Sequence, residues 1–249
     1  MNSPILELKQ ASLAASVGAD YLLRDITFAV NQKEKIAIVG ASGSGKTSLL
    51  RLLNHLVSPS AGKLLYQEVC YTEQNILQLR KQVVLVTQEP KLLGMTGKDA
   101  LRYPLQLQKL SDREIDRRFA KYSDMLQIPP AWLERDELNL SLGQRQLIAI
   151  ARGLMLEPKV LLLDEPTSAL DRRICDRLLM VLNQLNEHRQ VTILMVNHQL
   201  EISESFAERI LYLDEGKLIQ DIPASSENWQ RIDQQLRKTN QSLAEEWQD

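Results

Sequence analysis

The chain is poor in the residues that mark secreted scaffolds and membrane-spanning proteins. Only two of its 249 residues are cysteines, Cys70 and Cys175, and no Cys or His ladder has the spacing of a metal site. A disulfide framework is therefore excluded, and the reducing cytoplasm is the expected compartment. Apolar runs stay far below the roughly 20 residues that a membrane-spanning helix needs. Residues Met1–Pro4 also lack a signal-peptide pattern.

Net charge is small as well. The 30 basic and 32 acidic residues leave a formal charge of −2. This balance provides no basic footprint for nucleic acid, so no nucleic-acid partner is expected. The length suits one sizeable core with a subdomain better than two independent domains. Because no apolar run is long enough to span a bilayer, work at a membrane would require docking onto another chain.

Glycine, sparse elsewhere, gathers between a short β-branched run, Lys35–Val39, and a helical apolar pattern over residues 47–53. The run predicts a buried parallel strand. Strand, G-x-x-x-x-G-K-T and helix together predict a phosphate-binding loop, in which backbone N–H groups and the helix N-terminus face phosphate oxygens. Lys46 would bridge the β- and γ-phosphates, and the Thr47 hydroxyl would bind Mg²⁺. The nucleotide-binding residues expected here are Gly40, Ala41, Ser42, Gly43, Ser44, Gly45, Lys46, Thr47 and Ser48.

Asp164 and Glu165 follow a second apolar run, Val160–Leu163. Ligands of open α/β sheets bind at the carboxyl ends of the strands. Asp164 is therefore a candidate Mg²⁺ ligand, and Glu165 is a candidate general base for an attacking water. Taken alone, the pair could equally be two solvated carboxylates at a strand end.

Four further motifs accompany the phosphate loop and the Asp-Glu pair. Their order along the chain is Gln88, Leu140–Gln144, Ser168–Asp171 and His198. Leu140–Gln144 resembles the signature L-S-G-G-Q, and Ser168–Asp171 resembles a D-loop. Gln88 matches a Q-loop glutamine, and His198 matches a switch histidine. Over roughly residues 5–222 the chain resembles the ATP-binding subunit of an ABC (ATP-binding cassette) transporter.

This resemblance implies an α/β fold. The expected parts are a P-loop NTPase core with a mixed parallel sheet, an N-terminal antiparallel β subdomain and an inserted α-helical subdomain. The ATPase domain would span residues 1–222, with the helical lobe at about 91–155, and a polar helical tail would follow over 223–249.

The resemblance also implies roles for individual residues. Gln88 and His198 would act beside Glu165 in catalysis, with His198 bonding the γ-phosphate. Ser141, Gly143 and Gln144 would face ATP held by the phosphate loop of a second copy. Two ATP–Mg²⁺ would then lie between two head-to-tail chains, with Thr47, Gln88 and Asp164 as the metal ligands.

Two positions depart from the family pattern. Leu142 stands where the signature has glycine, and it is compatible with the motif only if its backbone is helical rather than at positive φ. We expect a helical Leu142 with its side chain turned away from the phosphate. The adenine-stacking aromatic should fall near Ala14 or Ala15, but both are small. Tyr21 is the nearest aromatic; it either stacks on adenine or is an ordinary strand residue.

Outside the motifs, apolar patterns predict the remaining elements. Ser111 begins a capping-box helix in the lobe, and residues 171–187 form a helix of the core. Asp214–Lys217 is expected to be a hairpin turn. Strands are expected at 26–30, 63–66, 160–164, 191–196 and 209–213. In the tail, Trp229, Ile232, Leu236, Leu243 and Trp247 recur at helical spacing. They predict a helix that lies either on its own domain or on a partner.

The function expected from the resemblance is that of a transport motor. ATP hydrolysis would drive a separate transmembrane permease, and the chain would be attached peripherally to the cytoplasmic face of the membrane through it. Gln88–Leu101 resembles the lobe opening of exporter-type cassettes, most of all the small ones linked to iron export and metal tolerance. The alternative is a soluble ABC ATPase that acts on ribosomes or DNA. Such chains usually carry two cassettes or a long coiled coil, and neither pattern occurs here.

Overall fold

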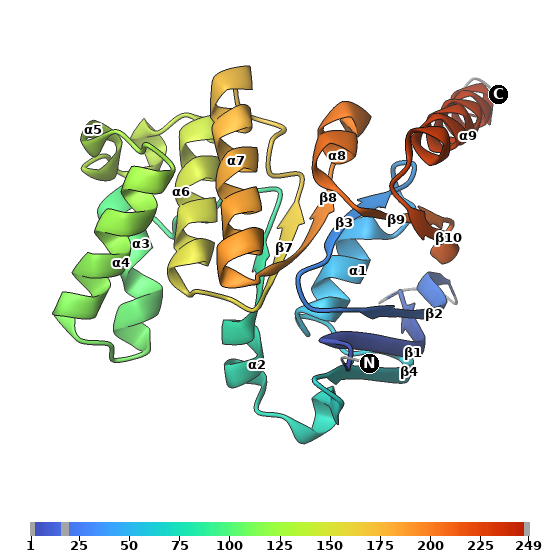
Figure 1. The fold of residues 1–249 in the computed structure, drawn as a ribbon, viewed down its shortest axis with the longest axis horizontal. Helices are drawn as coiled ribbons and strands as arrows, with labels where there is room; N and C mark the ends of the chain where they lie inside the picture. Colours follow the sequence, from blue (N-terminus) through green and yellow to red (C-terminus); the bar gives the residue numbers. More distant parts are fainter. Residues whose placement is uncertain (1–2, 16–19, 247–249) are drawn as a thin grey trace.

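The computed structural model describes residues 3–15 and 20–246, with side chains up to 239. Its centre is a sheet of order β10-β9-β3-β8-β7-β6 (Figure 1). The contacts among β9, β3, β8, β7 and β6 are parallel, and β10 pairs antiparallel with β9. The expected mixed parallel sheet is confirmed. The strands are β3 (Lys35–Val39), β6 (Val83–Val86), β7 (Val160–Asp164), β8 (Thr192–Val196), β9 (Arg209–Asp214) and β10 (Lys217–Pro223).

A second sheet forms the expected antiparallel subdomain. Its order is β2-β1-β4-β5, and helix α1 (Lys46–Leu53) packs between it and the central sheet, with four leucines fully buried. Because α1 begins at the last residues of the phosphate loop, this packing fixes the loop to both sheets. The remaining elements here are β1 (Leu6–Ala14), β2 (Tyr21–Val30), β4 (Ala61–Tyr66), β5 (Val69–Cys70), the 3₁₀ turn η1 (Tyr71–Glu73) and α2 (Ile76–Gln82).

The helical lobe lies to one side of the central sheet (Figure 1). Its core is continuous with one face of β6 and β7 through Val84, Val86, Leu161 and Leu163. Ser111 caps α4 as expected, accepting a hydrogen bond from the Glu114 N–H. The Glu114 carboxylate bonds arginines rather than closing a capping box. The lobe comprises α3 (Gly97–Leu107), α4 (Asp112–Met125), α5 (Pro130–Leu133), η2 (Glu137–Asn139) and α6 (Leu142–Met155).

The C-terminal part completes the core. Helix α7 (Arg172–Arg189) packs beside α6, and the short α8 (Leu200–Phe206), which no pattern predicted, follows β8. In α9 (Ser226–Glu246), Trp229 and Ile232 are buried against β3 and β9, so the tail helix lies on its own domain. The side chain of Leu243, and Trp247 altogether, fall outside the described residues. Within the described part of the chain, no helix is both long and apolar enough to cross a membrane.

Candidate active site

The phosphate loop connects β3 to α1, in the context that the sequence predicted. Gly45, just before the helix, has φ 100°. A side chain there would be strained, and a Cβ atom would lie 2.8 Å from the Leu22 carbonyl oxygen. Glycine therefore lets the loop turn into α1 while β2 passes close by. The first N–H groups of α1 are left pointing toward the loop, the arrangement that binds phosphate.

Lys46 folds back across the loop that carries it. Its Nζ donates to the carbonyl oxygens of Gly40 at 2.8 Å and Ala41 at 2.7 Å. Burial lowers the pKa of Lys46, and the negative charges of Glu165 and Asp164 oppose that shift. The ammonium group thus lies within electrostatic range of both predicted carboxylates, where it can compensate the charge of bound phosphates.

Thr47 and Asp164 meet at the carboxyl end of β7. The Thr47 hydroxyl donates to the Asp164 carboxylate at 3.2 Å. Burial raises the pKa of Asp164, and the hydrogen bond from Thr47 opposes the rise. A buried carboxylate next to a hydroxyl is a hard oxygen pair of the kind Mg²⁺ prefers. Both side chains therefore fit a magnesium ion. Gln88, the third expected ligand, bonds to Glu165 instead.

Glu165 lies between the other two predicted catalytic residues. Gln88 Nε2 donates to Glu165 Oε2 at 2.9 Å, and His198 Nε2 lies 2.6 Å from Glu165 Oε1. These residues follow β6, β7 and β8, three neighbouring strands of the sheet. The carboxyl ends of parallel strands meet at one edge, which is why residues far apart in sequence converge on one carboxylate.

The backbone of Glu165 is itself unusual. Its φ is 50°, the left-handed region that L-residues rarely occupy. Its N–H donates to the Val196 carbonyl at 2.9 Å, and its carbonyl accepts from the Ser168 hydroxyl at 3.1 Å. Such a conformation costs about 1–3 kcal/mol and persists only where the surroundings impose it. Here it aims the carboxylate away from the strand, toward the loop. No local sequence pattern signals this turn.

The phosphate loop, Gln88, Glu165 and His198 line a single pocket of about 360 Å³. Leu22 lines it too and was missed by sequence reasoning, whereas Tyr21 does not line it. Successive strand residues point to opposite faces. Tyr21 is 46% exposed on β2, pairs with Ala14 and has the Arg24 guanidinium 5.7 Å from its ring centroid.

The signature residues open helix α6 as expected. Ser141 and Gln144 form a reciprocal capping box, with Gln144 N to Ser141 Oγ at 3.2 Å and Ser141 N to Gln144 Oε1 at 3.0 Å. Leu142 is the first helical residue, is not among the residues with positive φ and is 50% exposed. Its predicted helical backbone is confirmed. Gly143 lies against the D-loop, where any Cβ atom would overlap the Ala169 carbonyl oxygen.

None of the residues that line the loop pocket comes from the signature. The phosphate-loop pocket and the signature at the start of α6 are therefore separate surfaces within one chain. One carries the phosphate loop and the Glu165 carboxylate, and the other presents a capped helix end.

The comparison with known families agrees with this geometry. The model of the family described as "ABC transporter" matches residues 23–168, more than half of the chain. The chain belongs to the ABC transporter ATPase family. It is thus an ATP-hydrolysing ABC ATPase, and the motor subunit of an ABC transporter.

Several transport proteins are similar over most of their length. The glutamine transport ATP-binding protein GlnQ of Geobacillus stearothermophilus is 34% identical over 83% of this chain and 86% of its own. The arginine transport ATP-binding protein ArtP of Escherichia coli is 35% identical over 84% and 88%. The methionine import protein MetN 1 of Staphylococcus aureus is 32% identical, but this ABC ATPase spans only 59% of that relative.

A solved structure matches the fold as well. It is the dimeric post-hydrolysis state of the ATP-binding cassette MJ0796 bound to ADP and Pi, with a TM-score of 0.82 and 26% identity over 89% of this chain and 99% of that one. The P-loop NTPase architecture expected from the motifs is thereby confirmed.

Proposed function

We propose that two copies of this ABC ATPase bind two ATP molecules head to tail and that their hydrolysis drives a separate membrane subunit. The separation of the two surfaces within one chain supports this most directly. The signature helix end lies outside the loop pocket. Its free N–H groups and the Ser141 hydroxyl form an anion-binding end. A second copy would supply the γ-phosphate for it, and the resemblance to a dimeric cassette bound to ADP and Pi fits that arrangement.

Within each site the chain's residues have distinct tasks. Lys46 and the loop N–H groups hold the phosphates. Thr47 and Asp164 would hold Mg²⁺, which when bound neutralises charge on the phosphate oxygens. Glu165 accepts a proton from the attacking water, because its carboxylate faces the loop between Gln88 and His198. His198, 2.6 Å from Glu165, orients that carboxylate, and because it lines the same pocket as the phosphate loop it would bond the γ-phosphate of a bound ATP.

A groove between core and lobe fits the membrane subunit. It has a volume of about 640 Å³ and includes Gln88 on the core side. On the lobe side Leu93 and Leu107 are 64% and 65% exposed, and Tyr103 is exposed as well. Exposed apolar side chains gathered in a groove are a feature of protein-binding surfaces. A segment of the permease seated there would contact Gln88, and the cassette would be held at the cytoplasmic face of the membrane.

The direction of transport has two candidates. The relative named for methionine import favours uptake of a small solute. The exporter-like lobe opening at Gln88–Leu101 favours the opposite direction. Reconstitution with the permease in vesicles, with ATP on the cassette side, decides between them by whether labelled solute moves toward or away from the ATP.

A complementation experiment tests the head-to-tail site. Lys46→Ala removes the loop's cation, and Ser141→Arg places a bulky cation at the signature. Each variant alone should be inactive. A mixed pair contains one site with an intact loop and an intact signature, so mixing should restore ATP cleavage in a single turnover with protein in excess. The double variant Lys46→Ala/Ser141→Arg is the control and should restore nothing when mixed with either single variant. Mixtures as inactive as their components would refute the shared site.

A second experiment tests the groove. Leu107→Asp should reduce co-purification with the permease, whereas Ile219→Asp, a 50% exposed residue on the edge strand β10, should not. Equal retention of the permease by both variants would place its docking site elsewhere.

A further inference from the structure

A pocket of about 300 Å³ lies at the amino ends of the parallel strands β7 and β8, whereas the ATP site lies at their carboxyl ends. Its wall includes Pro158 and Lys159, just before β7, and Val191, just before β8. Asp164 and His198 stand at or beyond the other ends of the same strands. The rest of the wall is contributed by α4, α6 and α7, through Tyr122, Leu154, Leu185 and Arg189. The pocket is therefore independent of the nucleotide and joins the helical lobe to the core.

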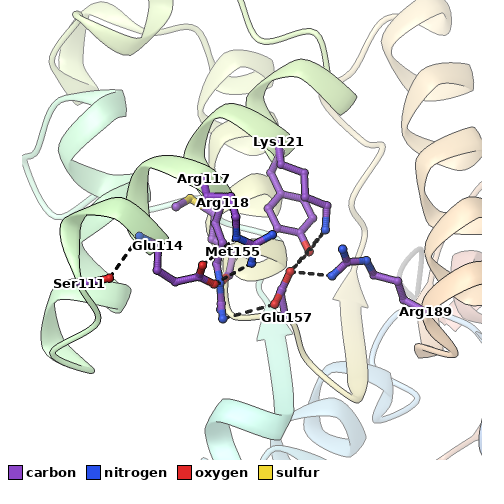
Figure 2. A network of polar contacts seen from close by, with 9 residues as sticks. Ser111, Glu114, Arg117, Arg118, Lys121, Met155, Glu157 and Arg189 are labelled. Carbon is purple, nitrogen blue, oxygen red and sulfur yellow. Dashed lines mark hydrogen bonds and ion pairs between the residues drawn. The ribbon is translucent and has the colours of Figure 1, made fainter.

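Figure 2 shows the charged side chains beside this pocket. Glu157, in the pocket wall, accepts from Arg189 at 2.6 Å and from Lys121 at 3.4 Å through Oε1, and its Oε2 lies 3.3 Å from Arg118. One carboxylate from the loop after α6 thus contacts cations of both α4 and α7. Arg118 is also shared with Glu114, at 2.7 Å.

The cations outnumber the carboxylates that pair with them. Glu114 additionally holds Arg117 at 2.7 Å. Lys159, exposed at the pocket, makes no ion pair within the described part of the chain. In the basic cluster, four cations therefore share the two carboxylates Glu114 and Glu157, and Lys159 stands in the pocket wall without an ion pair in the described part of the chain. The members of the basic cluster are Arg117, Arg118, Lys121, Lys159 and Arg189.

The protonation states keep this excess in place. Burial alone would raise the pKa of Glu157, but Arg118, Lys121 and Arg189 more than offset it, and the pKa lies below its ordinary value. Glu157 is therefore ionised without any ligand, and its one negative charge is divided among Arg118, Lys121 and Arg189. Burial also lowers the pKa of Lys121, and the positive charge of Arg189 lowers it further. The cluster repels its own members, which a further anion would relieve.

The shape of the pocket suits a small ligand. Leu154, Pro158, Leu185 and Val191 provide apolar parts of the pocket wall. Such walls lower the local dielectric and strengthen the attraction between a cation and an anion at the pocket. The volume is at the lower end of the range found for small-molecule sites. Guanidinium and ammonium groups together are the donors that bind oxyanions of the phosphate class.

We propose that this pocket binds a small divalent oxyanion of the phosphate class between Lys159 and Arg189. The anion would give Lys159 a partner and would share Arg189 with Glu157. Bound there, it would connect the end of α7 to the loop after α6 and, through Glu157, to α4. The site is thus a second anion site of this ABC ATPase, separate from the phosphate loop.

Hydrogen exchange separates the two sites in one sample. The full chain is incubated with inorganic phosphate or with chloride at matched ionic strength. Phosphate should slow exchange in peptides covering residues 118–122 and 186–191, in addition to any protection over the loop at 40–48. In Lys159→Ala and Arg189→Ala the protection at the pocket should require about tenfold more phosphate. The loop should respond as in the wild type.

Lys63→Ala is the matched control, because Lys63 is an exposed lysine on β4 in the other sheet. It should retain the full protection at the pocket. A pocket whose exchange is the same in phosphate and in chloride, or whose protection survives both Lys159→Ala and Arg189→Ala, would overturn the proposal.

The same exchange measurement with vesicles of phosphatidylglycerol, compared with vesicles of phosphatidylcholine, tests whether the pocket binds a lipid headgroup instead. Protection by the phosphatidylglycerol vesicles and not by free phosphate would show a lipid headgroup site and would also overturn the proposal.

Discussion

The Asn197 side-chain amide donates a 2.7 Å hydrogen bond to the hydroxyl of Thr167, and both side chains are buried. Asn197 directly precedes His198, and Thr167 follows Glu165 by two residues. The side-chain oxygen Oδ1 of Asn197 also accepts from the Gln199 N–H at 2.9 Å. The loop that carries the switch histidine is thereby fixed to the segment that carries the general base, which explains the short distance between them.

Asn197→Ala should therefore lower kcat about tenfold while leaving KM for ATP nearly unchanged. The substitution removes the hydrogen bond that holds His198 beside Glu165, but it touches no phosphate-binding group. Steady-state ATPase kinetics measure both parameters. Thr167→Ser keeps the hydroxyl and should stay close to wild type, whereas Thr167→Val should behave like Asn197→Ala. A change confined to KM would contradict the positioning role.

Glu165→Gln should reduce hydrolysis by roughly 10²–10⁴-fold while ATP binding persists, because the amide keeps the size of the side chain but cannot accept a proton. Trapped ATP should then hold two copies together. Size-exclusion chromatography with ATP and Mg²⁺ should show a dimer, which disappears without nucleotide. A variant that hydrolyses ATP at the wild-type rate would rule Glu165 out as the base.

Leu22→Ala should weaken ATP binding more than Tyr21→Ala does. Leu22 lines the pocket beside the loop, whereas Tyr21 is not among the residues that line it. Stacking on adenine contributes on the order of 1 kcal/mol, so its absence predicts poor discrimination between ATP and GTP. Titration of both variants with a fluorescent ATP analogue measures the effect. If Tyr21→Ala causes the larger loss, Tyr21 stacks on the base after all.

Leu142→Gly should change ATP turnover by less than about tenfold. Leu142 already has the helical backbone that the signature needs, so glycine adds no new conformation, although it weakens the first turn by about 1 kcal/mol. Ser141→Arg should abolish turnover, because its bulk and charge would enter the closed dimer interface. Both are measured as ATP hydrolysis at saturating nucleotide. A large gain of activity in Leu142→Gly would show that leucine restrains this cassette.

The elements that carry chemistry could be predicted because their signals are local. The strand before the loop, the cap at Ser141 and the apolar run before Asp164 each depend on a few neighbouring residues. The six motifs then specified which of these elements meet.

The rest depends on contacts between distant segments. The left-handed Glu165 is held by a hydrogen bond to Val196 at the end of the neighbouring strand, and Leu22 reaches the pocket only because β2 passes close to Gly45. The bond from Asn197 to Thr167 likewise joins two loops that only the sheet brings together. Local propensity contains no information on which distant segments come into contact. For the same reason, neither the short α8 nor the cluster around Glu157 was predicted.

The close approach of Gly143 to Ala169 has a consequence for timing in the proposed pair. Within one copy, the helix end offered to the neighbour's ATP rests on the backbone of the loop that follows its own Glu165. No side chain lies between them to absorb a displacement. A shift of that loop when one ATP is cleaved would therefore move the helix end that covers the other ATP. Hydrolysis of one ATP would then change how the other ATP is covered, so the two sites of the proposed pair would not act independently.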